Sequence, residues 1–314
     1  MTGEKFDFYS KVVIKSYNLD NQIRYQLKML DSLDAYTRKH SENVANITCR
    51  LCEYLKMDKG FTVYTTTCAF IHDIGKLFIP PQILQKPARL TDEEYEVIKT
   101  HTTIGYKMCI EDPKLRPYAA GPLYHHEALN GKGYPSGLKG KDIPYEAQII
   151  RVADEFEAIT SKRQYKTHVG ISDTLKLVAR NSDPDQEPRF WGLKLLTDEA
   201  RLGRIDKKIV KALFKVVVDD TEYEIVSREE YLKFLKDEIK RLEEAHEFYE
   251  KMMGAGTESK REYYKQGVEM YLKTHEVAEK CPEILDEFKE AYRLRKDHVK
   301  RLYDEVSVIK GIVI

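Results

Sequence analysis

Apolar residues recur along most of this chain at intervals of three and four positions, the spacing of one face of an α-helix. Before residue 35 this spacing is carried by Leu19, Ile23, Leu27, Leu30 and Leu33. The following stretch repeats it at Val44, Ile47, Leu51 and Leu55. No segment needs the alternating pattern of a strand, so we predict an all-α fold in which residues 1–33 form a helical lead-in.

Helix boundaries follow from capping residues and helix breakers. Thr91 with Glu94 three positions later forms a capping box, and the apolar spacing after it predicts one helix that continues past His101. The pair Pro80-Pro81 ends the preceding helix and begins a loop. Residues 181–191 are predicted to be a loop or insertion, and their tryptophan, Trp191, is either a core anchor or a lid over a base.

The last third of the chain is predicted to be a separate helical region, residues 227–314. Ser227-x-x-Glu230 is a second capping box, and Gly254 and Gly256 separate the charged helical segments. The amphipathic faces of these helices must pack on the catalytic part of the chain or on a second copy, so we expect a homodimer through the C-terminal helices.

Composition excludes several classes of protein. The 314 residues carry 52 Lys and Arg against 52 Asp and Glu, so no net field favours a polymeric nucleic acid or an acidic membrane surface. No apolar run is long enough for a transmembrane helix, and the first residues lack a signal-peptide core, so we expect a cytoplasmic protein without a membrane partner. The five cysteines are predicted to be reduced core thiols.

Histidines gather in one part of the chain. Five of the nine fall between Lys39 and Glu127: His40, His72, His101, His125 and His126. The other four lie among charged residues and are predicted to be solvated: His168, His246, His275 and His298.

Each clustered histidine stands in a helical context that suits a pocket. His72 precedes Asp73, and Lys76 one helical turn later shares its face. Asp154 closes an apolar stretch, where a carboxylate is costly to bury unless it meets a cation or a metal. Taken singly, His72-Asp73 is better explained by an ion pair or a capped helix end, and His101 by a hydrogen-bonded core histidine. Taken together, imidazoles and carboxylates on separate helices predict a metal site.

The ordered set resembles the HD-GYP branch of the HD-domain metallophosphohydrolases over roughly residues 34–218, which we take as the catalytic domain. The matching motifs are His40, His72-Asp73-Ile74-Gly75-Lys76, His101, His125-His126-Glu127, Gly133-Tyr134-Pro135 and Asp154. This resemblance implies an HD-type helical bundle around a metal cluster, with an additional C-terminal helical bundle. It also implies a phosphodiesterase that hydrolyses cyclic di-GMP to linear pGpG or GMP with a metal-activated hydroxide.

The resemblance assigns roles to individual residues. The metal ligands it implies are His40, His72, Asp73, His101, His125, His126 and Asp154. Asp73 would bridge two metals, with Lys76 as a second catalytic group. The implied substrate contacts are Lys76, Arg163, Lys166, Gly133, Tyr134 and Pro135. Mixed imidazole and carboxylate ligands suit iron or manganese, with zinc as a further option.

The chain departs from the family pattern at four positions. Tyr36 stands where some members have a glutamate that binds a third metal, so we predict a two-metal site. Ala128, Asn130 and Glu157 replace an arginine and two aspartates of the family. These changes leave the core ligands intact but keep cyclic GMP-AMP or a linear dinucleotide open as substrate. Two other functions stay open: a receptor or scaffold that binds cyclic dinucleotides without turnover, and a phosphohydrolase of another nucleotide.

Overall fold

A computed structural model of the chain describes residues 35–86, 88–160, 188–272 and 280–312. Within these ranges every regular element is a helix, and the single strand-like contact is one bridge between Asn130 and Lys139. The predicted all-α fold is therefore confirmed. The predicted lead-in, residues 1–33, lies outside the described residues.

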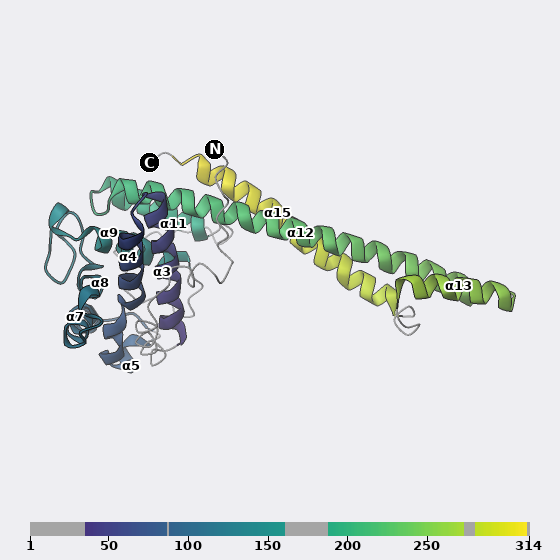
Figure 1. Cartoon of the computed structure of the whole chain (residues 1–314), viewed down its shortest axis with the longest axis horizontal. Helices are drawn as coiled ribbons and strands as arrows, with labels where there is room; N and C mark the ends of the chain where they lie inside the picture. The colour runs from purple at the N-terminus through teal and green to yellow at the C-terminus, as the bar shows by residue number, and fades with distance from the viewer. Residues whose placement is uncertain (1–34, 87, 161–187, 273–279, 313–314) are drawn as a thin grey trace. The chain divides into compact units, whose positions relative to one another are not determined.

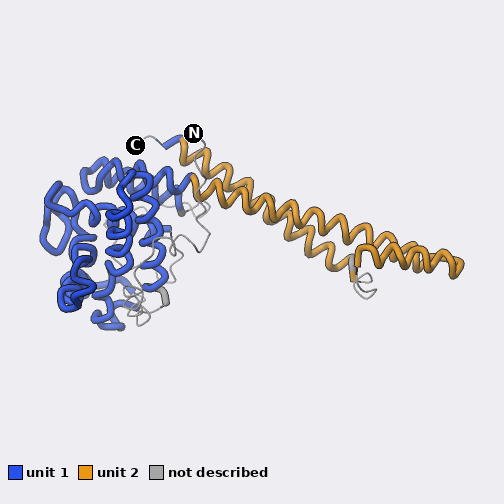
Figure 2. The backbone as a smooth tube through the Cα atoms, viewed as in Figure 1, with its two compact units in different colours: residues 1–218, 311–314 blue, residues 219–310 orange. Residues whose placement is uncertain are grey.

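The chain divides into two compact units, coloured separately in Figure 2. Unit 1 comprises residues 1–218 and 311–314, and unit 2 comprises residues 219–310. The helices of unit 1 are α3 Ala35–Tyr54, α4 Lys59–Ile71, η2 Ile74–Phe78, α5 Pro81–Leu84, α6 Asp92–Lys99, α7 His101–Glu111, η3 Arg116–Tyr118, α8 Ala120–Tyr124, η4 Gly140–Asp142, α9 Tyr145–Thr160 and α11 Pro188–Arg201.

The core of unit 1 forms where α3, α4 and α11 pack around α9 (Figure 1). Helix α9 is buried along most of its length, and Ile149 and Ile150 are fully buried within it. Leu51 of α3, Ile71 of α4 and Leu196 of α11 are buried against the same core. Each such side chain contributes roughly 1.5–3 kcal/mol by leaving water. This packing fixes the helices that carry the candidate ligands.

The capping box at Thr91 is confirmed, but the single helix predicted after it is wrong. The Thr91 side chain accepts from the Glu94 amide and the Glu94 carboxylate accepts from the Thr91 amide, so both halves of the box are present. The helix then breaks at Thr100, whose hydroxyl donates to the Val97 carbonyl at 2.6 Å. A side chain that competes for the last carbonyls of a helix favours its end. A new helix, α7, therefore starts at His101.

Two predicted loops also contain helix. The short helix α5 begins at Pro81, because proline suits the first turn, where its missing N–H costs nothing. Helix α11 begins at Pro188 and places Trp191 inside a helix rather than in a loop, while residues 181–187 lie outside the described residues. Asp154 likewise lies inside α9, which continues to Thr160 instead of closing after the carboxylate.

Unit 2 is helical, as predicted, but its first helix does not start at Ser227. Helix α12, Lys207–Met253, runs without a break through that residue and through the division between Val218 and Asp219. The apolar spacing continues on both sides of Ser227, so its hydroxyl has no helix end to cap. Gly254 and Gly256 do separate helices, because α13 Glu258–Tyr271 begins after an N-cap at Thr257.

Helix α15, Cys281–Lys310, runs antiparallel to the unit 2 part of α12. Lys310 pairs with Glu222 at 2.6 Å, and Tyr303 donates to Glu229 at 2.8 Å. The same register holds where Lys289 meets Glu243 at 2.7 Å. An apolar cluster shared by the three helices completes the unit: Leu242, Ala245, Val268, Leu272 and Leu285.

Histidines and cysteines outside the main cluster differ in how well they were predicted. His246 and His298 are partly solvated, with 27% and 30% of their side chains exposed. His168 and His275 lie outside the described residues. The cysteines that the structure describes in full are buried free thiols, as predicted: Cys49, Cys52, Cys68 and Cys109. No described helix is long and apolar enough to cross a lipid bilayer.

Candidate metal centre

All seven predicted ligands meet in unit 1, although they come from five separate segments. His40 lies on α3, His72 caps the C-terminal end of α4 and precedes Asp73, and His101 opens α7. His125 caps α8 and precedes His126, and Asp154 comes from α9. Six of the seven side chains are buried, and His126 is partly buried.

Local backbone geometry orients three of the imidazoles. The Nδ1 atom of His72 lies 2.7 Å from the Ala69 carbonyl, and that of His101 lies 2.7 Å from the Ile98 carbonyl. The Nδ1 atom of His125 lies 3.0 Å from the Gly121 carbonyl. A carbonyl can only accept, so each Nδ1 carries the proton and each Nε2 keeps a free lone pair. This is the tautomer that a metal-binding histidine needs.

His40 is oriented by a carboxylate instead of a backbone carbonyl. Its Nδ1 lies 2.5 Å from Oε2 of Glu157, and its Nε2 lies 3.0 Å from Oδ1 of Asp154. Asn43 holds the same Glu157 carboxylate by donating to Oε1 at 3.0 Å. Our reading of the sequence treated Glu157 only as a departure from a family pattern. Its position one turn after Asp154 on an apolar helix was the signal for this role.

The Asp73 carboxylate lies between two groups of imidazoles. Its Oδ2 is 3.5 Å from Nε2 of His40 and 3.3 Å from Nε2 of His72. Its Oδ1 is 3.4 Å from Nε2 of His101 and 3.9 Å from Nε2 of His125. The two oxygens of one carboxylate thus face different sets of ligand atoms.

The donor set fits divalent metal ions. Ligand atoms within 4.8 Å of one another occur in three overlapping groups: His40 with His72 and Asp73; His72 with His125 and Asp154; and His101 with His125 and His126. The Nε2 atom of His72 and the Oδ1 atom of Asp73 are buried without a hydrogen-bond partner. The Nε2 atoms of His101 and His125 face each other at 3.2 Å. Facing lone pairs and orphaned buried acceptors are costly without a cation, and a metal between them removes this cost.

The protonation states of His101, His125, His126 and Asp73 agree with this fit. Burial lowers the pKa of His101 to about 4 and holds the pKa values of His125 and His126 well below their usual range. Burial alone would raise the pKa of Asp73, but the neighbouring His72 and the Lys76 ammonium hold that pKa well below its usual range. His40 differs, because Asp154 and Glu157 outweigh its burial and raise its pKa to about 9. Neutral imidazoles and an ionised carboxylate are the forms that bind metals.

Lys76 reaches the centre by a different route from the one predicted. Helix α4 ends at Ile71, so Lys76 does not share a helical face with His72. The 3₁₀ helix η2 instead turns the Lys76 ammonium onto Oδ2 of Asp73, and both side chains are at least nine-tenths buried. Lys76 therefore supports the carboxylate directly.

The loop that contains Gly133, Tyr134 and Pro135 is tied to the histidine pair. Glu127, buried beside His126, accepts from the Ser136 amide at 2.7 Å and from the Leu138 amide at 2.9 Å. The Tyr134 ring stacks on His126, with 4.7 Å between centroids. A side-chain atom at Gly133 would lie 2.3 Å from the Ala128 nitrogen, so only glycine allows this approach.

Two predicted substrate contacts, Arg163 and Lys166, lie outside the described residues, as does the side chain of Tyr36. Lys99 was missed by the sequence reasoning, and its ammonium lies 5.6 Å from the centre of the Tyr134 ring. It is an ordinary helix-end lysine in the sequence, so no local signal distinguishes it.

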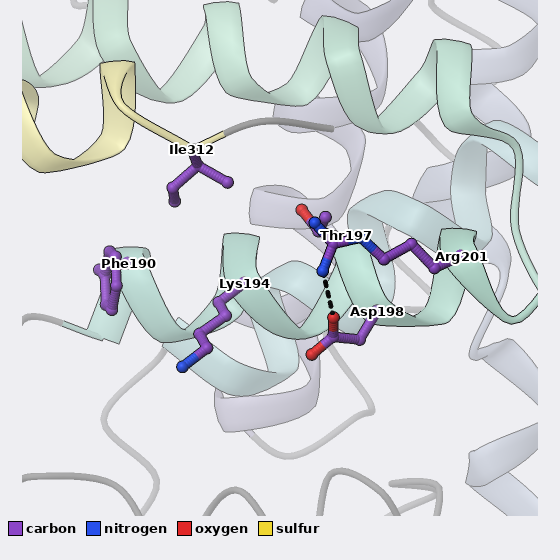
Figure 3. Close-up of a pocket in the computed structure, with 6 residues that line it drawn as sticks. All are labelled: Phe190, Lys194, Thr197, Asp198, Arg201 and Ile312. Atoms are coloured by element: carbon purple, nitrogen blue, oxygen red, sulfur yellow. Dashed lines mark hydrogen bonds and ion pairs between the residues drawn. The ribbon is translucent and has the colours of Figure 1, made fainter.

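A cavity of about 260 Å³ elsewhere in unit 1 contains none of the predicted site residues (Figure 3). It is lined by Phe190, Lys194, Thr197, Asp198, Arg201 and Ile312. Its cations are engaged locally, because Arg201 pairs with Asp198 at 3.1 Å and Lys194 lies over the Trp191 ring. We assign it no function.

Comparison with known proteins gives consistent matches over about half of the chain. The model of a family described as the HD domain matches residues 24–186. A protein of Thermotoga maritima named cyclic di-GMP phosphodiesterase is 42% identical over 156 residues, covering 48% of this chain and 42% of that protein. The 3'3'-cGAMP-specific phosphodiesterase 3 of Vibrio cholerae is 30% identical over 177 residues, covering 55% and 38%.

A third relative is the cyclic di-GMP phosphodiesterase response regulator RpfG of Xanthomonas campestris. It is 36% identical over 141 residues, covering 44% of this chain and 37% of that protein. The aligned region thus spans less than half the length of each of these relatives.

Proposed function

The chain belongs to the HD domain family, and on that premise we propose that it is a metal-dependent phosphodiesterase of cyclic dinucleotides, with cyclic di-GMP as the first substrate to test. The observation that carries the proposal is the position of Asp73, whose two carboxylate oxygens face two different groups of imidazole nitrogens. The resemblance drawn from the motifs is confirmed at the level of the family.

The seven ligands would hold two divalent transition metals, which we propose to be iron or manganese, with zinc as the alternative. Asp73 would be common to both positions. His40, His72 and Asp154 would complete one position, and His101, His125 and His126 would complete the other. When bound, such metals would supply Lewis-acid activation of water and neutralise phosphate oxygens.

The surrounding residues would orient the reacting groups. The Glu157 carboxylate holds the ring of His40, and the Lys76 ammonium holds Asp73. Because Lys76 is the cation next to the shared carboxylate, it is also placed to donate to a phosphoryl oxygen as negative charge grows there. The Tyr134 ring stacks on His126, and Lys99 lies over the Tyr134 ring. Together these three side chains would form one wall of the substrate site.

The choice of substrate rests on relatives with two different names, cyclic di-GMP phosphodiesterase and 3'3'-cGAMP-specific phosphodiesterase. Arg163 and Lys166 remain proposed phosphate contacts, because arginine forks and lysine charges suit phosphate. Arg163→Ala should weaken substrate binding while leaving metal content unchanged.

The decisive experiment incubates the full chain, loaded with Fe²⁺ or Mn²⁺ under anaerobic conditions, with cyclic di-GMP and separately with 3'3'-cGAMP. Chromatography of the products distinguishes linear pGpG from GMP, and metal analysis of the same sample gives occupancy. Linear or mononucleotide products support the proposal. Full occupancy with bound but uncleaved cyclic dinucleotide would replace it with a receptor, and cleavage of other nucleotides alone would replace it with a different phosphohydrolase.

Self-association through the C-terminal helices and a cytoplasmic location stay predictions. On α12 of unit 2, Tyr223, Val226 and Phe234 are 38%, 46% and 54% exposed. If a second copy covers these side chains, Phe234→Glu should convert a dimer to a monomer in sedimentation equilibrium. A monomeric wild-type chain at the same concentrations would remove the prediction.

A further inference from the structure

Five histidines contribute to the candidate centre, and four of them have a ring nitrogen fixed by a hydrogen bond. His72, His101 and His125 donate to backbone carbonyls, and His40 meets Glu157. Within the part of the chain that the structure describes, no such bond fixes the ring of His126. Its ring orientation must therefore come from contacts with the rings of Tyr134, His101 and His125 and from the position of its own backbone.

One side chain holds that backbone. Arg151, on α9, directs Nη1 at two successive carbonyls, at 2.8 Å from the oxygen of His126 and 2.9 Å from that of Glu127. Its Nη2 binds Glu155 at 2.7 Å, and only 12% of each of these two side chains is exposed. The guanidinium is therefore a mostly buried fork whose Nη1 and Nη2 donors bind two main-chain oxygens and one carboxylate.

The hydrogen bond from Arg151 to the His126 carbonyl matters because it joins two segments that each carry candidate ligands. Arg151 precedes Asp154 by one helical turn, so the same helix carries the fork and a ligand of the other group. The carbonyl of His126 also accepts from the Tyr134 amide at 3.2 Å. One peptide oxygen thus joins the histidine pair, the loop of Tyr134 and the helix of Asp154.

From these contacts we infer that Arg151 is a positioning residue for the candidate metal centre, acting through His126. It fixes the distance between the group of His101, His125 and His126 and the helix that bears Asp154. The inference rests on the proposed metal centre, but not on which substrate the protein cleaves.

The test titrates the metal-free full chain with Mn²⁺ and records stoichiometry and affinity without any substrate. Arg151→Met removes all donors while keeping an unbranched stem in place of the aliphatic part of the side chain. We expect it to weaken one of two Mn²⁺ sites by about 10- to 100-fold, the loss seen when an outer partner of a ligand is removed. The other site should keep its wild-type affinity. Arg151→Lys keeps one cationic donor group, so its Mn²⁺ affinity should fall between those of the wild type and Arg151→Met. It serves in the same titration if Arg151→Met does not fold.

Two controls separate positioning from general destabilisation. Arg241 in unit 2 also donates to a carbonyl, that of Tyr271 at 2.7 Å, so Arg241→Met matches the chemistry away from the centre and should bind both metals normally. Glu155→Gln leaves the fork to the two carbonyls in place and should retain both sites.

The double variant Arg151→Met/His126→Ala gives the sharpest result. If Arg151 acts through His126, the double variant should bind metal no more weakly than His126→Ala alone, because the group that Arg151 positions is already gone. Additive losses, or equal losses at both sites in Arg151→Met, would overturn the inference. A wild-type chain that binds two metals but cleaves no dinucleotide would refute the proposed function and leave this result intact.

Discussion

Gly75 lies in η2, between Asp73 and Lys76, and it tests how tightly the residues of the candidate metal centre are packed. A β-carbon at this position would lie 1.9 Å from the His101 carbonyl oxygen and 2.7 Å from the Gly105 nitrogen. Both neighbours are backbone atoms of α7, so neither can rotate away. Gly75→Ala therefore requires α7 and η2 to separate.

The size of that movement can be worked from the distances. Ordinary van der Waals contact for such an atom begins at 3.4 Å, so the start of α7 must retreat by about 1.5 Å. Metal ligands tolerate only about 0.2 Å, and His101 lies at the displaced end. We expect the group of His101, His125 and His126 to lose metal affinity by at least about 10- to 100-fold. Overpacking of this kind should also cost about 1–3 kcal/mol of stability.

The assay combines Mn²⁺ binding by equilibrium dialysis with thermal unfolding of the metal-free chain. Gly256→Ala is the matched control, because a β-carbon there meets nothing within 4 Å. The control should match wild type in both measurements. Wild-type affinity at both metal sites together with an unchanged melting temperature in Gly75→Ala would refute the reasoning, since the 1.9 Å contact could then be relieved without moving His101.

Three further predictions follow from the same geometry. Asp73→Ala removes the carboxylate shared by both groups, so metal content and turnover should both be lost; equal metal content and activity in this variant and in wild type would contradict the shared role. Lys76→Met should lower turnover far more than it lowers metal content, because Lys76 is a donor next to the centre and not a ligand; an unchanged turnover number would show that Lys76 only balances charge. Burial raises the pKa of Cys52 and of Cys109 to about 12, so these thiols stay protonated at pH 8.5, where only thiolates react. In a Cys281→Ser variant, dithionitrobenzoate should therefore report reactive thiols only after denaturant is added, and rapid reaction of the native chain would contradict the buried positions.

Features that depend on neighbours along the chain were predictable from the sequence. The three- and four-residue apolar spacing gives helices because each helical face is a local repeat, and the Thr91 capping box is formed within four residues. The candidate ligands were also visible in the sequence, because the ordered motifs resemble a family whose ligands are imidazoles and carboxylates. The seven residues that this resemblance assigns as ligands lie together in the structure, so the candidate metal centre could be proposed from the sequence.

Tertiary structure decided which atoms face each other. The pairing of Glu157 with His40 depends on how segments 117 residues apart pack together. The break at Thr100 and the contact of Lys76 with Asp73 are local, but the apolar spacing did not reveal either of them. Arg151 is the extreme case, since its partners lie 24 and 25 residues earlier and are main-chain oxygens that no side-chain pattern marks. Sequence specifies local propensity and the available donors, whereas packing of helices sets their directions and distances, on which coordination depends.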